Sequence, residues 1–448
     1  MKQFFKKYIG DLFLTSRFYL VGGVVAALLM VRHFILGLGL LPMVLLWAFI
    51  MLFLIEYVLL FFKQNALDAY RKMPSRFSNG DNNDVVLHLT NRYSFPIYLT
   101  IVDEIPAQFQ RRDIAFKTRM DGHSDREYRY RLRPVKRGVY PFGNINNYVS
   151  CLVGLLQRRF QNGEGKDVAV YPSYQQLRKY QLLALHNQLQ DSGQKRLQQI
   201  GSSFEFDQIR EYVTGDDYRT VNWKATARKG TLMVNHYTEE KSQPIYSVID
   251  KGRLMEMPFD QMSLLDYAIN AALVLSNIAI YKEDKAGLIT FSKKPETLLL
   301  ADRKPGQMLR IQEHLYHEKT AFPESDFERL YITIKRHVTQ RSFLILFTNF
   351  ESMEALHRQL PYLRKIAQTH LLLVVFFQNS IVKSLVEQPA ETLKEMYTQT
   401  IAEQFDAEKK LIVQELQRFG ILALLTSPKN LTANTINKYL EVKRKNLL

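Results

Sequence analysis

The sequence predicts an α/β plus all-β protein: two N-terminal transmembrane helices, a small antiparallel β-sandwich, and a doubly wound α/β domain. Three observations predict this. A long apolar segment stands near the N-terminus, alternating polar and apolar residues follow it, and strand and helix patterns then alternate. We expect a two-helix anchor over residues 1–66, the sandwich over 76–173, a connecting helix and a motif-bearing segment over 174–243, and the α/β domain over 244–448.

Length, charge and cysteine content narrow the classes of partner and of site. With 448 residues the chain is longer than one typical domain, so several cores are expected. Lys and Arg exceed Asp and Glu by 16, which favours an anionic partner: a lipid surface, a nucleic acid or an acidic protein. Net charge alone does not choose among them. The one cysteine, Cys151, excludes an intramolecular disulfide and a zinc site built on cysteines.

The N-terminal apolar segment fits two membrane crossings, and therefore a lipid bilayer as the first partner. Residues 18–62 contain only two formal charges, Arg32 and Glu56, and about 20 apolar residues are enough for one crossing. We expect helices over residues 18–36 and 41–62, with a break at residues 37–42. Glu56 fits a carboxylate near the membrane interface better than a proton relay, because it is the only acid in the segment.

Basic residues flank the predicted helix pair at its two chain ends, whereas the short connection holds only Arg32. Because cytoplasmic flanks carry the excess of Lys and Arg, both termini are expected in the cytoplasm and the helices in the inner membrane. The flanking residues are Lys2, Lys6, Lys7 and Arg17 before the helices, and Lys63, Arg71, Lys72 and Arg76 after them.

After a polar linker over residues 75–84, alternation with period two predicts the short strands of a sandwich. The clearest strand covers residues 126–133, with one aromatic and one cationic face. Tyr128, Tyr130 and Leu132 form the first face, and Arg129, Arg131 and Arg133 the second. A solvated outer face explains these arginines better than binding of anionic lipid or nucleic acid, because no recognition helix or aromatic platform accompanies them. We expect no nucleic acid partner.

From residue 244 onward, apolar runs alternate with amphipathic stretches, as in a parallel sheet covered by helices. Expected strands are residues 245–249, 286–291, 342–347, 371–377 and 421–425, and expected helices are 263–281, 351–367, 394–419 and 431–445. Ligands of such sheets bind at the carboxyl ends of the strands, where Asp250 and Asn349 stand. No glycine-rich phosphate loop follows any of these strands, so nucleotide binding has no support.

A dense motif precedes the α/β domain and is the most specific feature of the sequence. It consists of Arg210, Glu211, Tyr212, Gly215, Asp216, Asp217, Arg219, Trp223, Ala227 and Arg228. This motif closely resembles the signature of the bacterial family known as domain of unknown function 58. The two apolar N-terminal spans, residues 137–140, Gly154-Leu155 and Tyr171-Pro172 extend the resemblance over nearly the whole chain.

The resemblance implies a C-terminal domain similar to the von Willebrand factor A domain, which is usually a protein-binding module and not an enzyme. It also implies action beside an AAA+ ATPase of the MoxR type, in the assembly or activation of other complexes. No catalytic residue and no cofactor follow from it.

The metal site of a von Willebrand factor A domain is degenerate in this sequence. Such a site needs Asp-x-Ser-x-Ser after the first strand, because a carboxylate and two hydroxyls supply oxygen ligands to magnesium. The chain has Asp250, Gly252 and Leu254 there, and Asn349 where a later acid is expected. Both hydroxyls are missing and Arg253 adds a repelling charge. We therefore expect no metal at this edge of the sheet.

The signature motif allows three interpretations. In the first, its acids and arginines form a charge-paired clamp that fixes the segment against the first strand of the α/β domain, while Tyr212 and Trp223 bury apolar area. In the second, the same side chains present a docking surface. In the third, Asp216 and Asp217 bind the metal of a hydrolase. We favour the clamp, because the neighbouring arginines neutralise the acids most simply.

A weaker cluster follows helical spacing farther along the chain. Glu313, His314, His317 and Glu318 suit a zinc site by residue type. No third ligand is evident for the histidine pair, so a solvated helix face is the favoured interpretation.

Overall fold

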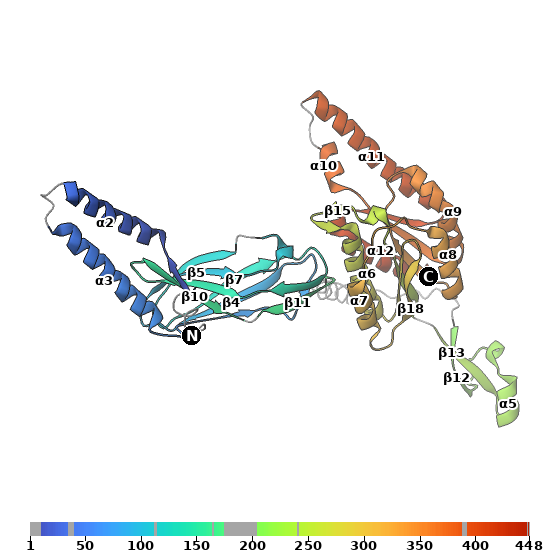
Figure 1. Ribbon diagram of the computed structural model, residues 1–448. Helices are drawn as coiled ribbons and strands as arrows, with labels where there is room; N and C mark the ends of the chain where they lie inside the picture. Colours follow the sequence, from blue (N-terminus) through green and yellow to red (C-terminus); the bar gives the residue numbers. More distant parts are fainter. Residues whose placement is uncertain are drawn as a thin grey trace. The chain divides into compact units, whose positions relative to one another are not determined.

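The computed structural model describes residues 10–34, 40–111, 114–163, 165–173, 204–239, 242–387, 392–445 and 447. The chain divides into two compact units, Met1–Tyr171 and Pro172–Leu448 (Figure 1). The predicted connecting helix before residue 204 lies outside the described residues, as does the predicted end of the first apolar helix at Leu36.

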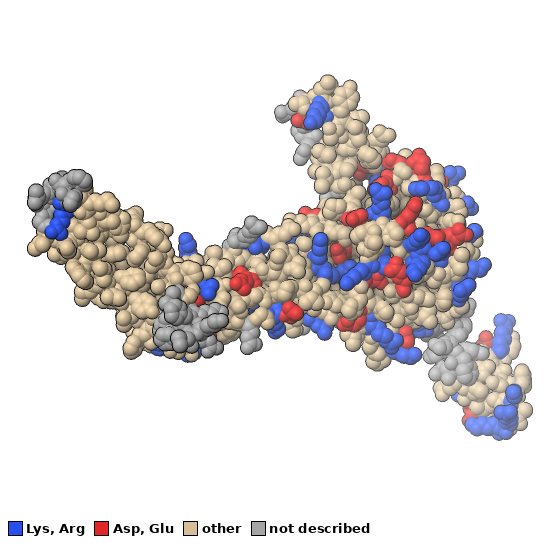
Figure 2. Space-filling model, viewed as in Figure 1, with Lys and Arg blue, Asp and Glu red and all other residues tan. Residues whose placement is uncertain are grey.

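Two apolar helices open the first unit. α2 covers Ser16–Phe34 and α3 covers Leu41–Phe61, close to the predicted spans. The two helices pack together through aromatic rings: the centroid of Phe18 lies 5.2 Å from that of Phe49 and 5.6 Å from that of Phe53. Figure 2 shows a surface almost free of charged side chains along both helices in this view. The pair therefore presents an apolar exterior over most of its length.

Length and hydropathy single out two of the described helices as able to cross a membrane: α3, and α6 at Leu264–Tyr281. They differ in burial, because 17% of the apolar window of α3 is buried against 72% of that of α6. α6 is thus the core helix of the second unit, and α3 is the candidate span. α2 is not one of these two helices, but it also exposes large apolar side chains, among them Leu20 and Met30.

A β-sandwich makes up the rest of the first unit. Its strands are β1 (Leu12–Leu14), β2 (Leu67–Lys72), β3 (Arg76–Ser78), β4 (Asn83–Asn91), β5 (Ile97–Asp103), β6 (Ala115–Met120), β7 (Asp125–Leu132), β8 (Gly138–Phe142), β9 (Ile145–Ser150), β10 (Leu156–Asn162) and β11 (Lys166–Tyr171). They form sheets in the orders β1-β10-β9-β5-β6, β2-β4-β7 and β3-β11-β8. Pairing is antiparallel as expected, apart from a parallel β3–β11 pair. The core between the sheets includes Leu60 and Phe61 at the end of α3.

Three strands lie before or within the expected linker, where the sequence predicts no strand. β1 precedes α2 and pairs with β10, β2 follows α3 and pairs with β4, and β3 lies within the expected linker. The sandwich therefore begins well before residue 76. β2 resembles a charged linker because Asp68, Arg71 and Lys72 lie along it, yet Leu67 and Ala69 alternate with them and are buried.

The predicted two-faced strand is confirmed as β7. Tyr130 and Leu132 are buried, while Arg129 and Arg131 are exposed. The Tyr130 hydroxyl donates a hydrogen bond to the buried carboxylate of Asp103. The aromatic face of β7 thus closes the core, and its arginines face solvent.

The second unit is built on a six-stranded sheet in the order β18-β17-β14-β19-β20-β21. Its strands are β14 (Pro244–Asp250), β17 (Lys285–Phe291), β18 (Pro295–Asp302), β19 (Phe343–Phe347), β20 (Leu371–Phe377) and β21 (Leu422–Thr426). The five strands expected from apolar runs are all present and parallel. β18 is an additional antiparallel edge strand, and its half-exposed residues lack the continuous apolar run that marked the others.

Helices cover both faces of this sheet. α6, α7 (Gln307–His317) and α12 (Leu431–Arg444) contribute to the core on one face. α8 (Phe327–His337), α9 (Met353–Thr369) and α11 (Leu393–Arg418) contribute to the core on the other. α10 (Ser380–Glu387) packs against α11. Shorter elements are the 3-10 turns η3 (Ala107–Phe109), η5 (Arg253–Met255) and η6 (Pro428–Asn430), and the strand pair β15 (Pro258–Phe259) and β16 (Met262–Ser263).

The signature motif lies in a β-hairpin. β12 (Phe204–Glu211) pairs antiparallel with β13 (Met233–Glu239), and the connection between them contains η4 (Tyr218–Thr220) and α5 (Trp223–Lys229). The side chain of Asn222 caps the start of α5 by accepting a hydrogen bond from the Ala225 amide. Gly230 ends α5 with a φ of 76°, a conformation that favours glycine.

Candidate functional site

The carboxyl ends of β14 and β19 meet at a polar rim centred on Asp250. This side chain is 3% exposed and accepts three hydrogen bonds: from the Gly252 amide at 2.8 Å, from the Thr348 hydroxyl at 2.7 Å, and from the Ser325 hydroxyl. Burial raises the pKa of this carboxyl, although the three donors oppose the rise. The carboxylate that would bind a metal in an intact site is thus held by hydroxyls and an amide of the chain itself.

Ser325 occupies the space that a side chain at position 252 would need. A Cβ atom on Gly252 would lie 1.9 Å from Oγ of Ser325, closer than any packing allows. The hydroxyl next to Asp250 therefore comes from a residue 75 positions later in the chain. The sequence shows that the motif serine at position 252 is missing, but no local pattern reveals Ser325 as the group in its place.

Lys251 points into the same end of the sheet and is buried, with 1% exposure. Its ammonium lies 2.6 Å from a carboxylate oxygen of Glu318 and 2.6 Å from one of Glu296. Glu318 also accepts hydrogen bonds from the hydroxyls of Thr290 and Thr297. Glu318 is therefore a buried partner of a lysine, and not part of the solvated helix face that the sequence favoured.

Lys409 brings a second ammonium to the rim from α11. It donates a hydrogen bond to Oδ1 of Asn349 at 3.1 Å and another to the carbonyl of Phe350. Burial lowers the pKa of Lys409 to about 8, while the charges of Glu351 and Glu408 act in the opposite direction. Asn349, which stands where an intact metal site has an acid, is thus bound by a lysine.

Leu254, the last of the degenerate metal-site positions, lies in η5 and is half-buried. Among the described residues, no group of three or more His, Cys, Asp or Glu side chains is arranged to hold a metal ion. The absence of a metal at this rim stays a prediction, which the hydroxyls and lysines around Asp250 and Asn349 support.

An exposed apolar row runs along α11 and ends at the rim. Leu393, Tyr397, Ile401 and Phe405 follow at intervals of four residues, so they lie along one side of the helix. Their exposed fractions are 71%, 66%, 54% and 51%. Lys409 is the next member of the same series. Side chains of this size are rarely left exposed in a row unless a partner covers them.

A hollow of about 490 Å³ opens beside the rim serine. Both charge signs line it, with three acids from the start of α8 and one lysine among them. Its lining residues are Lys293, Pro323, Glu324, Ser325, Asp326, Phe327, Glu328, Gln359 and Tyr362. Ser325, whose hydroxyl donates to Asp250, thus also lines this hollow.

Charged residues of the signature hairpin pair with one another. Asp216 accepts from the Arg210 guanidinium at 2.6 Å and from the Val213 amide at 2.9 Å. Asp217 caps η4 through the Arg219 amide at 3.0 Å. Lys229 lies 3.2 Å from a carboxylate oxygen of Glu211. These contacts support a clamp within the hairpin, and both acids of the hydrolase interpretation take part in them. Seating of the hairpin against β14 stays a prediction.

The expectation that Trp223 buries apolar area is wrong. Its side chain is 71% exposed, and that of Tyr218 is 74% exposed, while Tyr212 is half-buried. Arg219, Ala227 and Arg228 are exposed as well, and Gly215 forms the turn with a φ of 114°. The hairpin thus combines an internal clamp with an exposed surface of aromatic and basic side chains, so features of the clamp and of the docking-surface interpretation occur together.

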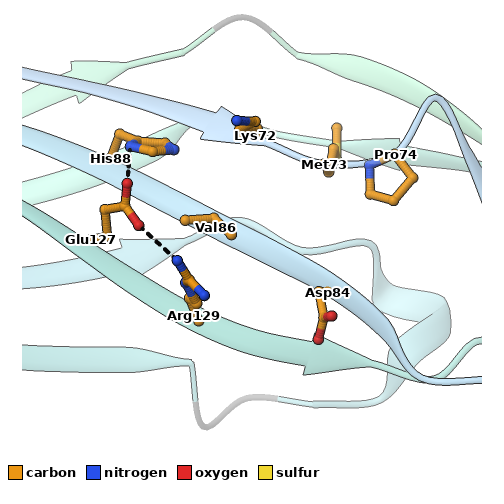
Figure 3. A pocket seen from close by; sticks show the side chains of 8 residues that line it. All are labelled: Lys72, Met73, Pro74, Asp84, Val86, His88, Glu127 and Arg129. Atoms are coloured by element: carbon orange, nitrogen blue, oxygen red, sulfur yellow. Dashed lines mark hydrogen bonds and ion pairs between the residues drawn. The ribbon is translucent and has the colours of Figure 1, made fainter.

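The arginine row of β7 borders a second hollow, of about 410 Å³, on the outer face of the β2-β4-β7 sheet (Figure 3). Glu127 bridges Nδ1 of His88 at 3.1 Å and the guanidinium of Arg129 at 3.2 Å. The next arginine, Arg131, lies 3.0 Å from Asp84. Because acids of the same sheet face these arginines, the row fits a solvated and partly neutralised surface better than a binding site for an anionic polymer.

Comparison with known proteins yields one family match and one curated relative. The sequence model of the family described as "Protein of unknown function DUF58" matches residues 208–400, which include most of the signature hairpin and much of the α/β unit. The "Uncharacterized protein YeaD" of Bacillus subtilis (strain 168) is 26% identical over 212 residues, or 46% of this chain and 53% of that protein. The chain thus spans about half the length of the curated relative it matches.

Solved structures with partial likeness include two bacterial proteins. The conserved hypothetical protein BatB from Bacteroides thetaiotaomicron aligns over 45% of this chain and 98% of its own, with 14% identity and a TM-score of 0.30. An aerotolerance-related membrane protein from Bacteroides fragilis NCTC 9343 aligns over 30% of this chain and 66% of its own, with 15% identity and a TM-score of 0.23.

Proposed function

We propose that this chain is a membrane-anchored scaffold whose α/β unit binds another protein through the apolar row of α11 and the adjoining rim. The observation that carries the proposal is the series Leu393, Tyr397, Ile401 and Phe405, exposed along one side of a helix and continued by Lys409 onto Asn349. Such a row suits the helix-in-groove mode of protein recognition, in which large side chains at four-residue intervals serve as anchors.

The proposed partner is an AAA+ ATPase of the MoxR type, in the assembly or activation of other complexes. The family match over residues 208–400 supports this choice, because the signature motif resembles that of proteins that accompany such ATPases. The parallel sheet with helices on both faces and a polar rim at its carboxyl ends supports a fold similar to the von Willebrand factor A domain.

Binding is proposed to be independent of metal. A bridging cation has little to coordinate at the rim, because Asp250 is already bound by two hydroxyls and an amide. Asn349 likewise faces the Lys409 ammonium, which repels a divalent cation.

The anchor is proposed to be the α2–α3 pair in the inner membrane, with both chain ends in the cytoplasm. α3 is 21 residues long and apolar throughout apart from Glu56. The excess of Lys and Arg on the flanks of the pair supports this orientation.

A binding titration with a matched pair of variants tests the proposal. Ile401→Glu puts a charge in the row, and Leu309→Glu puts one on α7, where Leu309 is exposed to a similar extent at 56%. The full-length chain in detergent micelles is titrated with a purified MoxR-type ATPase from the same genome. We expect Ile401→Glu to raise the Kd about tenfold or more, and Leu309→Glu and added EDTA to leave it unchanged.

Three results contradict the proposal in different ways. Equal affinity of both variants removes the apolar row from the interface. Loss of binding on chelation by EDTA shows that a metal participates in binding, which contradicts the proposal that binding is independent of metal. If the unchanged chain fails to bind the ATPase, the choice of partner is wrong.

A further inference from the structure

The loop between β9 and β10 is fastened to the helix that leads out of the apolar pair. Glu56 of α3 is 3% exposed, and its carboxylate accepts hydrogen bonds from the backbone amides of Gly154 at 2.9 Å, Leu155 at 2.9 Å and Leu156 at 3.2 Å. A carboxylate that receives three backbone N–H groups is well satisfied even when buried. The loop is therefore held at the level of Glu56 along α3.

The start of the apolar pair holds the same loop from its other side. The hydroxyl of Thr15 donates to the carbonyl of Gly154 at 2.6 Å, and the Arg17 guanidinium donates to the carbonyl of Val153 at 3.0 Å. Gly154 has a φ of +70°, a conformation that side chains disfavour, and this turn aims its amide at Glu56. Residues at the start of α2 and near the end of α3 thus both hold the loop.

The exposed apolar surface of α3 continues past Glu56, toward the end of the helix. Glu56 precedes the end of α3 at Phe61 by about one and a half turns, or roughly 7 to 8 Å. On the outer side of that stretch, Val58 is 57% exposed, Leu59 is 45% exposed, and Phe62 is 87% exposed. If lipid covers these side chains, it also reaches the loop beside Glu56.

The loop itself carries exposed apolar side chains. Leu152 is 67% exposed and Val153 is 43% exposed, and the neighbouring strand β1 exposes Phe13 and Leu14 at 38% each. Cys151 and Leu155, on either side of this pair, are buried, so the exposed apolar side chains lie at the tip of the loop. The apolar surface of the helix pair thus continues onto the sandwich.

We propose that the loop at Leu152 and Val153 is a third membrane contact, which inserts these two side chains into the boundary between lipid headgroups and acyl chains. The inference rests on the anchoring part of the proposed function and extends it from the helices to the sandwich. The partner is the bilayer, because the exposed loop is continuous with the lipid-facing surface of α3 and is fixed to it by Glu56, Thr15 and Arg17.

Site-directed fluorescence in liposomes tests this contact. An environment-sensitive nitrobenzoxadiazole probe is attached to Leu152→Cys and, separately, to Val153→Cys in the full-length chain. Met51→Cys, on the exposed side of α3, reports anchoring. Val139→Cys, on β8, reports the aqueous end of the sandwich, because β8 pairs with β11 at the end away from the helices (Figure 1). Cys151 is buried at 7% exposure, and labelling of the unchanged chain measures its background reaction.

We expect the probes at positions 152, 153 and 51 to emit at shorter wavelength and to be quenched by lipids brominated on their acyl chains, and the probe at 139 to show neither effect. Quenching at 51 without quenching at 152 and 153 overturns the loop contact and leaves the anchor intact. Absence of quenching at 51 overturns the anchor itself, and the loop contact with it. Quenching at all four positions indicates general adsorption and also overturns the specific contact.

Discussion

Two of the buried carboxylates, Glu56 in the first unit and Asp250 in the second, receive hydrogen bonds from different kinds of donor. Glu56 receives three consecutive backbone amides, so it joins a helix to the sandwich through the main chain, in a turn whose φ at Gly154 favours glycine. Asp250 receives two hydroxyls and an amide, within a rim where Lys251 and Lys409 hold other polar groups. The first arrangement depends on backbone geometry and the second on side-chain identity. Single substitutions should therefore cost most in the rim.

The largest effect is expected for Lys251→Ala. Removal of this ammonium leaves Glu318, whose side chain is 5% exposed, without its cation, so unfolding free energy should fall by about 3–5 kcal/mol. Chemical denaturation of the full-length chain measures the loss. Lys304→Ala is the control, because the Lys304 side chain is 76% exposed and pairs with Asp302, and its effect should stay below about 1 kcal/mol. Equal losses for the two variants would falsify the structural role of Lys251.

A smaller effect is expected for Glu56→Gln, which keeps one acceptor oxygen and replaces the other by a donor. At least one of the three amides then loses its partner, at a cost of about 1–3 kcal/mol. Hydrogen exchange of the amides of Gly154, Leu155 and Leu156 should accelerate in the full-length chain in micelles. Glu127→Gln, on an exposed strand position, should leave this exchange unchanged. Unaltered protection in Glu56→Gln contradicts the fastening of the loop.

A pH-dependent effect is expected for Asp250→Asn. Burial raises the pKa of Asp250, so the folded chain holds this proton to higher pH than the unfolded chain does. The unfolding free energy therefore falls as pH rises from about 4, the pKa of an unfolded aspartate, toward the raised folded value. The variant lacks this contribution. Denaturation at several pH values should show the difference between the chains change across this window, and a constant difference contradicts it.

The smallest effect is expected from titration of Lys409. Its pKa of about 8 lies below the usual value near 10.4, so the unfolded chain keeps the proton at pH values where the folded chain has lost it. Unfolding free energy should rise with pH between these two values. NMR of labelled lysine side chains measures the midpoint, and the Lys409→Met variant assigns the signal. A midpoint above pH 10 contradicts the burial of this ammonium.

Local patterns in the sequence predict much of this fold. The five parallel strands have continuous apolar runs, and β7 alternates with period two, so each needs only its own residues to be recognised. β2 was not predicted, because the charged residues along it obscure the alternation of its two buried positions. Trp223 was expected to bury apolar area as part of the clamp, yet the short helix that carries it leaves it exposed.

The rim and the loop contact depend on partners distant in the chain. Ser325 lies 75 residues from Asp250, and the amides bound by Glu56 lie 98 to 100 residues from it. No spacing rule connects residues at such separations. The sequence therefore directs attention to Asp250, Gly252 and Asn349, but it does not predict the hydroxyl and the lysines around them.

The overlap between a Cβ at position 252 and Ser325 limits how this edge of the sheet can change over evolution. Gly252→Ser alone introduces a clash at 1.9 Å, whereas loss of the Ser325 hydroxyl alone takes a donor from Asp250. Either change by itself is unfavourable, so these two positions are expected to change together and not one after the other.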